Sequence, residues 1–180
     1  MAETKAAPEG KRPARRVSAA PEAAVNLDAT AEALQAILPT VYEGVDVTFG
    51  VAVDEVTVVA PAGLVPIVCR IAKDHELLDF DYLRCLAAVD YEDRIEVSYH
   101  LFSLAKRHKM IVKTNVTDDD LSVPTVISVW RGADWFERET HDLFGVTFAG
   151  HPNLKPLLLY EGFEGHPGRK SFPFHEYTEY

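Results

Sequence analysis

Hydrophobic positions that recur every three or four residues predict two helices in the first half of the chain. The first begins near Asp28 or Thr30 and ends at Pro39, because the proline ring cannot continue a helix. The second runs from Gly63 to about Glu76. We expect its apolar stripe to face the core, and the stripe consists of Leu64, Ile67, Val68 and Ile71.

Alternating hydrophobic and polar positions predict five strands. Two short strands follow the first helix, at 45–49 and within 51–59, with their turn at 53–56. Three longer strands follow the second helix, at 80–89, 95–101 and 110–114, with turns at 90–94 and 105–108. Helices on one face of such a sheet make two layers. The predicted fold class is therefore α+β, with two layers: helix, strand, strand, helix and three further strands of a mixed sheet, then a short helix and an extended C-terminal tail.

The short third helix is predicted at 134–144. Asp134 suits the capping position, Glu137 follows at the spacing of a capping box, and Gly145 suits the position that ends a helix. Charged groups crowd this helix between large aromatic residues: Glu137, Arg138, Glu139, His141 and Asp142. These residues alone leave two interpretations equally open. The charged groups either form a binding surface or form a solvated face, where local ion pairs contribute about 0.2–0.5 kcal/mol each.

Composition divides the chain into three parts. Residues 1–26 are rich in Ala, Pro, Glu, Lys and Arg and hold almost no large apolar residue, so we predict a disordered tail. Residues 27–148 form the predicted α+β domain, which includes the helix at 134–144. Residues 149–180 are rich in Gly, Pro, His and aromatic residues, and we expect this extended tail to bind a partner. The alternative is that the tail folds back on the chain's own sheet.

Charge and hydropathy exclude two classes of partner. The 180 residues carry a net charge of −10, which argues against nucleic acid, whose phosphates need clustered Lys and Arg. With 47% hydrophobic and 26% charged residues, the composition is that of a globular protein. The chain has no run of apolar residues long enough to span a bilayer. We therefore expect membrane attachment only through partner proteins.

The two cysteines and the glycines indicate no cofactor site. Cys69 and Cys85 are too few to hold an Fe–S cluster or a zinc ion by thiolates alone, and we expect both to be buried and reduced. The regularly spaced glycines near the end neither follow a strand nor open a helix, so they do not form a dinucleotide site: Gly162, Gly165 and Gly168.

Acid–base catalysis and metal binding have weak support. Glu139, His141 and Asp142 carry suitable groups, but the sequence indicates neither a pocket nor a shifted pKa around them. Four histidines with Asp142 have spacings that match no compact metal motif: His141, His151, His166 and His175. We predict no catalytic, cofactor-binding or metal-binding residue in this chain. A free-standing enzyme that uses the Glu/His/Asp cluster remains an alternative.

The segment from Asp134 to Pro152 reads DWFERETHDLFGVTFAGHP, and residues 165–173 read GHPGRKSFP. Together they strongly resemble the signature of the C-type subunit of respiratory complex I, and the resemblance covers roughly residues 30 to 175. The chain departs from the family pattern at three places. His141 stands where an aromatic residue is usual, Lys155-Pro156 replaces two arginines, and Ser171-Phe172 replaces an acidic–aromatic pair.

The resemblance implies a peripheral-arm scaffold subunit of a proton-pumping NADH–quinone oxidoreductase. A scaffold of this kind holds no cofactor itself, while FMN and Fe–S clusters lie in partner subunits. It implies docking onto the D-type quinone-site subunit and neighbouring Fe–S subunits, at the cytoplasmic face of the bacterial inner membrane or the matrix side of an organellar one. The expected interface residues are Glu137, Arg138, Glu139, Asp142, His151, Lys155, His166, Arg169 and Lys170.

Two alternatives to this assignment stay open. Similar subunits occur in membrane-bound NiFe hydrogenases and deazaflavin-dependent dehydrogenases, with the same fold and role. A generic adaptor unrelated to respiration is the second. Within the complex I interpretation, we expect Arg138→Ala to lower assembly, because the change would leave a carboxylate unpaired at the interface.

Overall fold

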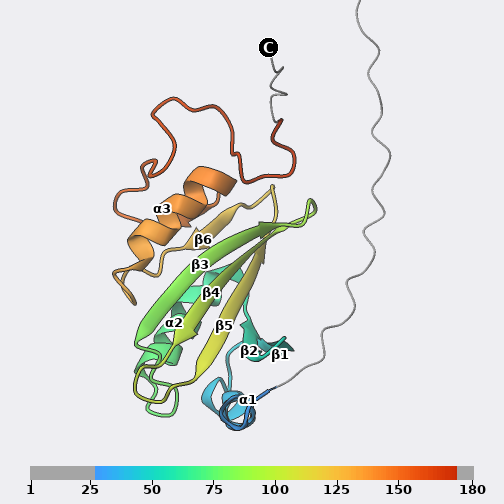
Figure 1. Ribbon diagram of the computed structural model, residues 1–180, viewed down its shortest axis with the longest axis vertical. Helices are drawn as coiled ribbons and strands as arrows, with labels where there is room; N and C mark the ends of the chain where they lie inside the picture. Colours follow the sequence, from blue (N-terminus) through green and yellow to red (C-terminus); the bar gives the residue numbers. More distant parts are fainter. Residues whose placement is uncertain (1–26, 174–180) are drawn as a thin grey trace, which may run out of the picture.

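A five-stranded mixed sheet forms the centre of the computed structural model, which describes residues 27–173 (Figure 1). Its strands lie in the order β1-β2-β5-β4-β3. Only β2 and β5 run parallel, and the other neighbours in this sheet are antiparallel. The bounds are β1 (Thr48–Ala52), β2 (Glu55–Val59), β3 (Tyr82–Asp90), β4 (Ile95–Phe102) and β5 (Lys109–Val116). The predicted mixed sheet and the three longer strands are confirmed.

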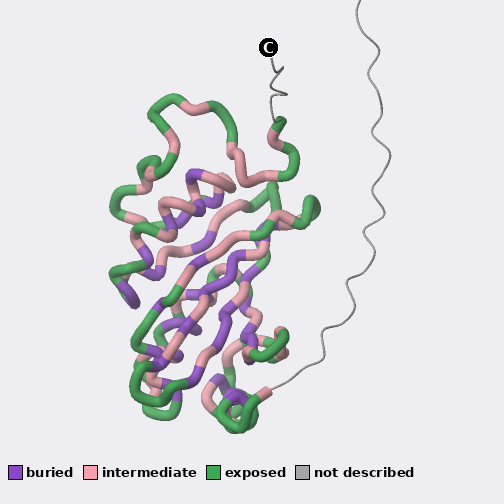
Figure 2. Tube along the Cα trace, viewed as in Figure 1, coloured by how far each residue is buried: buried purple, intermediate pink, exposed green. Residues whose placement is uncertain are grey.

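Helices cover one face of this sheet and enclose the core. They are α1 (Ala29–Val41), the short 3-10 helix η1 (Ala62–Leu64) and α2 (Val65–Asp74). Figure 2 shows buried stretches along the central strands. Buried strand residues at alternating positions include Val56, Val58, Val97, Tyr99, Leu101, Met110 and Val112. The predicted two-layer α+β class is therefore confirmed.

The first helix begins as predicted but ends later. Asp28 caps it by accepting a hydrogen bond from the backbone N–H of Ala31, at 2.7 Å. The prediction that Pro39 ends the helix is wrong, because α1 continues to Val41. Tyr42 holds this last turn: its N–H donates to the carbonyl of Leu38 at 3.0 Å, and its hydroxyl donates to the carbonyl of Val68 at 3.1 Å. This tertiary contact outweighs the tendency of proline to break a helix.

The second helix is rotated relative to its predicted stripe. Ile67, expected in the core, is 51% exposed, while Leu64 and Ile71 are only partly buried. The buried face also follows helical spacing and consists of Val65, Val68, Cys69 and Ala72. Small side chains at Cys69 and Ala72 pack in this face beside the two valines. The predicted stripe is therefore wrong at Ile67, whereas Leu64, Val68 and Ile71 pack on the core as predicted.

The boundary between the first two strands was also predicted wrongly. The turn lies at Val53 and Asp54, and β2 already begins at Glu55. Val53 takes a left-handed conformation with φ of 59°. Val45 and Val47 pack against the core before β1 begins, so their alternation resembles a strand. Of the two cysteines, Cys69 is buried as expected, whereas Cys85 is only half-buried, and neither forms a disulfide.

A second, two-stranded sheet has no counterpart in the prediction. β6 (Ser122–Pro124) and β7 (Thr147–Ala149) run parallel, with α3 (Ala133–Phe144) between them along the chain. Three residues are too few for a visible alternation. From residue 150 to 173 the chain makes turns without helix or strand. The predicted disordered tail at 1–26 and the end of the predicted partner-binding tail, 174–180, lie outside the described residues.

No helix within residues 27–173 combines the length and the hydrophobicity that crossing a bilayer requires.

Candidate functional site

The third helix lies beside the outer strand β3 and carries the densest group of predicted interface residues (Figure 1). It begins after Gly132 without a side-chain cap, so the predicted capping box of Asp134 and Glu137 is wrong. Glu137 instead points into the core. Gly145 ends the helix as predicted, with a left-handed φ of 79°.

Glu137 is fully buried and ties α3 to the segment after β6. One carboxylate oxygen accepts the hydroxyl of Thr125 at 2.6 Å, and the other accepts the backbone N–H of Val126 at 2.8 Å. Burial raises the pKa of Glu137 to about 7, against the lowering effect of both hydrogen bonds, and nearby Asp134 adds to the rise. Glu137 therefore lies in the interior rather than on a surface that a partner touches.

Asp142 binds the chain that follows the helix. A single carboxylate oxygen accepts three consecutive backbone N–H groups, from Leu157, Leu158 and Leu159, at 2.8–2.9 Å. Burial raises the pKa of Asp142, but the three N–H donors together hold it below its usual value. This arrangement fixes residues 157–159 against the helix. We call residues 150–173, which run along α3 in this way, the wrapping segment.

Arg138 also holds the wrapping segment. Its Nε donates to the carbonyl of Lys155 and its Nη2 to the carbonyl of Pro156, both at 3.0 Å. Within residues 27–173 the hydrogen bonds of Arg138 go to backbone, and its pairing with a carboxylate at a partner interface stays a prediction. Arg138 and Asp142 therefore bind adjacent residues of the wrapping segment by hydrogen bonds from the same helix.

Two histidines fasten the ends of α3. The His151 side chain is fully buried, and its Nε2 lies 3.1 Å from the carboxylate of Asp134 while Nδ1 accepts the N–H of Asn153 at 3.0 Å. His166 lies over the last turn, with Nδ1 3.0 Å from the carbonyl of Asp142. Its ring fills the space beside Gly145, where a Cβ would come within 2.7 Å of it. Both imidazoles therefore have structural contacts within the chain.

Arg169 and Lys170 fasten the wrapping segment to the end of the sheet. Arg169 donates through Nε to the carbonyl of Phe144 at 2.8 Å and pairs with Asp118. The backbone N–H of Lys170 donates to Asp90 at 2.9 Å. Together with neighbouring residues they border a cleft of about 390 Å³ that holds both signs of charge: Asp90, Glu92, Arg94, Asp118, Arg169 and Lys170.

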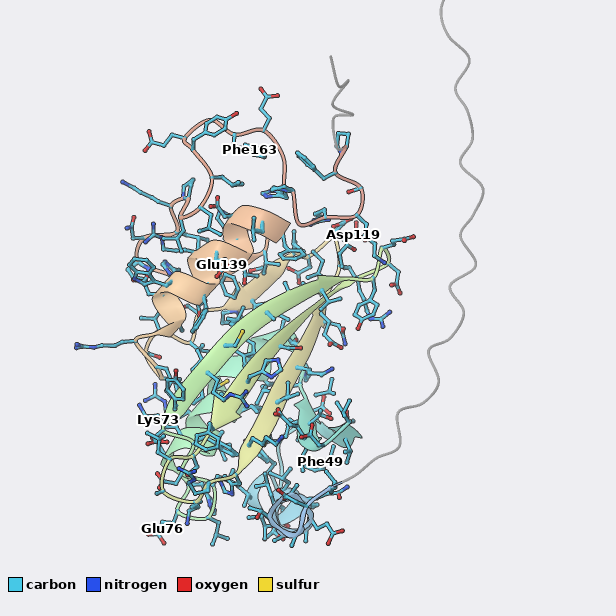
Figure 3. The ribbon with its side chains drawn as sticks, in the orientation of Figure 1. Phe49, Lys73, Glu76, Asp119, Glu139 and Phe163 are labelled. Atoms are coloured by element: carbon cyan, nitrogen blue, oxygen red, sulfur yellow. The ribbon has the colours of Figure 1, made fainter. Side chains whose placement is uncertain are left out.

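Two predicted residues remain, and the side chains of both Glu139 and Lys155 make no hydrogen bond or ion pair within residues 27–173. Glu139 lies on α3 (Figure 3) close enough to β3 to add to the raised pKa of the Cys85 thiol, after the larger effect of burial. Lys155 is exposed. Their charged groups are therefore available to a partner.

Large apolar side chains are exposed around α3. Trp135 is 64% exposed, Leu158 60% and Tyr160 71%. Tyr160 meets Phe163 edge-on at 5.4 Å, and Phe163 stacks on Phe172 at 5.9 Å. Aromatic residues and arginine are the usual anchors of protein interfaces. We call the exposed side of α3 and its wrapping segment the α3 surface.

The residues that complete this site come from distant parts of the chain. Thr125, Asp118 and Asp90 bind α3 or the wrapping segment across 12, 51 and 80 residues of sequence. No local pattern signals such contacts. Within residues 27–173, no group of three or more His, Cys, Asp or Glu side chains is placed to hold a metal ion.

Comparison with known sequences gives consistent matches. A family pattern described as the 30 kDa subunit of respiratory-chain NADH dehydrogenase matches residues 57–178. The C-type subunit of the NADH-quinone oxidoreductase of Caulobacter sp. (strain K31) is 40% identical over 82% of this chain and 70% of its own length. A C-type subunit of the same enzyme from Rhizobium meliloti (strain 1021) is 42% identical over 62% of each chain, so the match spans under two thirds of that relative.

Two solved structures share the fold. A trypsin-resistant fragment of Nqo5 is 26% identical, with a TM-score of 0.56, over 67% of this chain and 98% of its own. A chain of the membrane-bound sulfane sulfur reductase, described as an archaeal respiratory membrane complex, is 27% identical, with a TM-score of 0.68, over 78% of this chain and 86% of its own.

Proposed function

The chain belongs to the family of the 30 kDa, or C-type, subunit of respiratory-chain NADH dehydrogenase, and from this premise we propose that it is a peripheral-arm scaffold subunit of a proton-pumping NADH–quinone oxidoreductase. In this proposal it docks onto the D-type quinone-site subunit and neighbouring Fe–S subunits. FMN and Fe–S clusters lie in those partners. The assembly attaches this chain to the cytoplasmic face of the bacterial inner membrane, or to the matrix side of an organellar one.

The observation that supports the proposal is that side chains of the α3 surface hold its own backbone in a fixed arrangement. The family pattern covers α3 and the wrapping segment, and the acidic, basic and histidine side chains of this region hold their own backbone in place. A surface fixed in this way is pre-organised, which reduces the entropy lost when a partner binds. Trp135, Leu158 and Tyr160 supply exposed anchors on it.

The predicted interface residues take two roles in this proposal. Glu139, Lys155 and the exposed edge of Arg138 meet the partner directly. Glu137, Asp142, His151, His166 and Arg169 act through the backbone segments that they position. This chain supplies shape and orientation, while electron transfer from NADH to quinone is a property of the whole assembly.

Arg138→Ala tests this role. The change removes both donors that hold residues 155 and 156, so the wrapping segment shifts beside its anchor at Asp142. We expect the amount of assembled complex in membranes to fall by about tenfold, because the interface must then order a loosened segment. The measurement is the yield of the complex on native gels, with NADH–quinone activity per unit membrane.

Two further variants serve as controls for the Arg138→Ala result. Lys106→Ala, an exposed change on the turn between β4 and β5, should assemble normally. Arg138→Lys keeps the charge but not the fork that binds two carbonyls, so we expect an intermediate yield. Full assembly and activity of Arg138→Ala would contradict the role of the α3 surface.

A second candidate is the corresponding subunit of a sister membrane complex. The likeness to a chain of the sulfane sulfur reductase complex favours it, since this fold also serves an assembly with another name. Membrane-bound NiFe hydrogenases and deazaflavin-dependent dehydrogenases are further possibilities of this class. The identity of 40% or more to C-type subunits of NADH-quinone oxidoreductases supports the first candidate. The subunits that co-purify with this chain separate the two.

A further inference from the structure

A groove at the start of β3 is lined by none of the predicted interface residues. It runs between residues 81–83 and residues 127–132 and has a volume of about 610 Å³. Its buried lining is apolar and includes Leu83, Val129 and Trp130. Pockets that bury most of the surface of a bound ligand have volumes of about 300–1,000 Å³.

The lining of this groove holds two basic side chains and one acidic side chain, those of Lys73, Arg131 and Asp81. Lys73 donates to the carbonyl of Val129 at 2.6 Å, and the nearby Arg70 donates to Ser128. The exposed side chain of Arg131 makes no hydrogen bond or ion pair within residues 27–173. Asp81, the acidic residue of the lining, uses its carboxylate to accept the N–H of Leu104 at 2.9 Å. Within residues 27–173, Lys73, Arg70 and Arg131 therefore form no ion pair, and Asp81 leaves one negative charge among the lining residues.

Among the described residues, the strand beside the groove pairs with another strand on one side only, and α3 packs beside part of it. β3 is the outer strand of the sheet, and within residues 27–173 only β4 pairs with it. Tyr82, its first residue, lines the groove and is 50% exposed. An unpaired strand edge with a neighbouring apolar pocket accepts an extended peptide, which gains backbone hydrogen bonds and a place for one side chain.

The groove also adjoins the α3 surface. Gly132 lines it and immediately precedes α3, and the exposed Trp135 lies in the first turn of that helix. A partner bound to the α3 surface therefore reaches the groove with a short segment.

We propose that this groove is a second docking site, and that its occupant is an extended segment of a neighbouring subunit that carries a large apolar side chain beside one or more carboxylates. The apolar side chain packs on Trp130 and Leu83. The carboxylates pair with Arg131 and Lys73, which supply the charge complementarity that selects an acidic segment. The inference rests on the proposed function for the existence of the assembly, but not on the contacts proposed for the α3 surface.

Photo-crosslinking within the intact membrane complex tests it. Tyr82 is replaced by p-benzoylphenylalanine in the tagged chain, membranes are irradiated, and the crosslinked peptide is identified by mass spectrometry. We expect one dominant crosslink to an assembly subunit, in a peptide with Asp or Glu next to the crosslinked residue. Absence of any crosslink between subunits, or a crosslinked peptide without carboxylates, would overturn the proposal.

A matched pair of charge reversals supplies the second readout. Arg131→Glu places a like charge against the acidic segment, and we expect the Tyr82 crosslink to fall by about tenfold. Arg131→Lys should retain it. Arg107→Glu makes the same charge change on the turn between β4 and β5, at another exposed arginine without an ion pair in residues 27–173, and should leave the crosslink unchanged.

The outcomes separate the two proposals. If the tagged wild-type chain recovers no assembly subunits, the proposed function fails and the groove proposal with it. If the subunits are recovered but Arg131→Glu and Arg107→Glu give equal crosslinking at Tyr82, only the groove proposal fails.

Discussion

Glu137 and Asp142 lie five residues apart on α3, and their environments shift their pKa values in opposite directions. Glu137 is enclosed in the core with one hydroxyl and one N–H donor, and burial keeps its pKa high. Asp142 receives three N–H donors on one oxygen, and these outweigh burial and keep its pKa low. Of these two carboxylates in one helix, Glu137 therefore titrates near neutral pH and Asp142 below its ordinary value.

Glu137→Gln should change how stability depends on pH. The folded chain keeps a proton on Glu137 up to about pH 7, whereas the unfolded chain releases it near pH 4.3. Stability of the wild type therefore falls as pH rises between these values, and Gln removes that loss. From about pH 5 to about pH 8, urea unfolding should show the variant gaining about 2–3 kcal/mol relative to the wild type. A stability difference that stays constant across this range would contradict the burial of the charge.

Asp142→Asn should loosen residues 157–159. The amide keeps the shape of the carboxylate but not its charge, and hydrogen bonds to a charged acceptor contribute about 1.5–3 kcal/mol. We expect exchange of the Leu157, Leu158 and Leu159 amides to accelerate by about tenfold or more at neutral pH. The exposed Asp119, labelled in Figure 3, offers the control Asp119→Asn, which should leave these amides unchanged.

Acid should have the same effect on the wild type as Asp142→Asn. Because the pKa of Asp142 is lowered in the folded state, its stabilising effect is present above the ordinary value near 3.9 and is lost as pH falls through the lowered value. The amides of residues 157–159 should therefore lose protection below about pH 4 in the wild type, while Asp142→Asn shows no such step.

Sequence reasoning found many of the residues of the α3 surface but not what most of them contact. The charge density of residues 137–142 stands out locally, and Gly145 ends the helix as its residue type predicts. The contacts of Glu137 and Asp142 depend on Thr125 and on residues 157–159, which the fold alone brings to α3. Spacing along one helix could not distinguish an internal anchor such as Glu137 from an exposed group such as Glu139.

At the scale of elements, the wrapping segment packs closely against the end of α3 at Gly145 and Gly168. A Cβ added to Gly168 would lie 2.8 Å from the carbonyl oxygen of Leu143 and 2.9 Å from the ring of Phe144. The N–H of Gly168 also donates to that carbonyl at 2.8 Å. The absence of a side chain therefore permits a direct backbone contact between two elements.

Gly168→Ala should separate the wrapping segment from α3. Relief of this overlap requires a backbone shift that costs about 1–3 kcal/mol. We expect faster trypsin cleavage after Arg169 and Lys170, followed by mass spectrometry of the purified chain. Gly132→Ala is the matched control, because nothing lies within 4 Å of its added Cβ. Equal cleavage of the two variants would show that the contact does not hold the segment.

The prediction of elements succeeded for long strands and failed where tertiary contacts determine the bounds or the orientation of an element. β3, β4 and β5 are eight or nine residues long and were recovered close to their bounds, although a bulge between Leu83 and Cys85 interrupts the alternation of β3. Tyr42 extends α1 past Pro39, and on α2 the small residues Cys69 and Ala72 are buried while Ile67 is exposed. β6 and β7 exist only as a pair brought together across α3, so neither is visible alone.

At the scale of the molecule, ion pairs fasten the wrapping segment to the far end of the sheet. Arg169 pairs with Asp118 and Lys170 with Glu92, and the acidic partners in both pairs are largely exposed. Exposed pairs weaken when salt shortens the Debye length, which is about 3 Å at 1 M. This attachment should therefore depend on ionic strength, unlike the buried contacts of Asp142.

Asp118→Asn tests that attachment. In the wild type, trypsin cleavage after Arg169 should accelerate as salt rises from about 0.05 M to about 1 M. In the variant, cleavage should be fast at low salt and respond less to added salt. Asp119→Asn, the adjacent change without the ion pair, should behave like the wild type. A wild type that shows no salt dependence would contradict the ion-pair attachment.

The central claim is that this chain works as a scaffold within a respiratory assembly, and one purification tests it most directly. The tagged chain is isolated from detergent-solubilised membranes, and the co-purifying subunits are identified by mass spectrometry. The account predicts recovery of a D-type quinone-site subunit together with Fe–S and NADH-oxidising subunits. Recovery of hydrogenase-type subunits in their place would move the chain to a sister complex, and recovery of no partner would contradict the scaffold function.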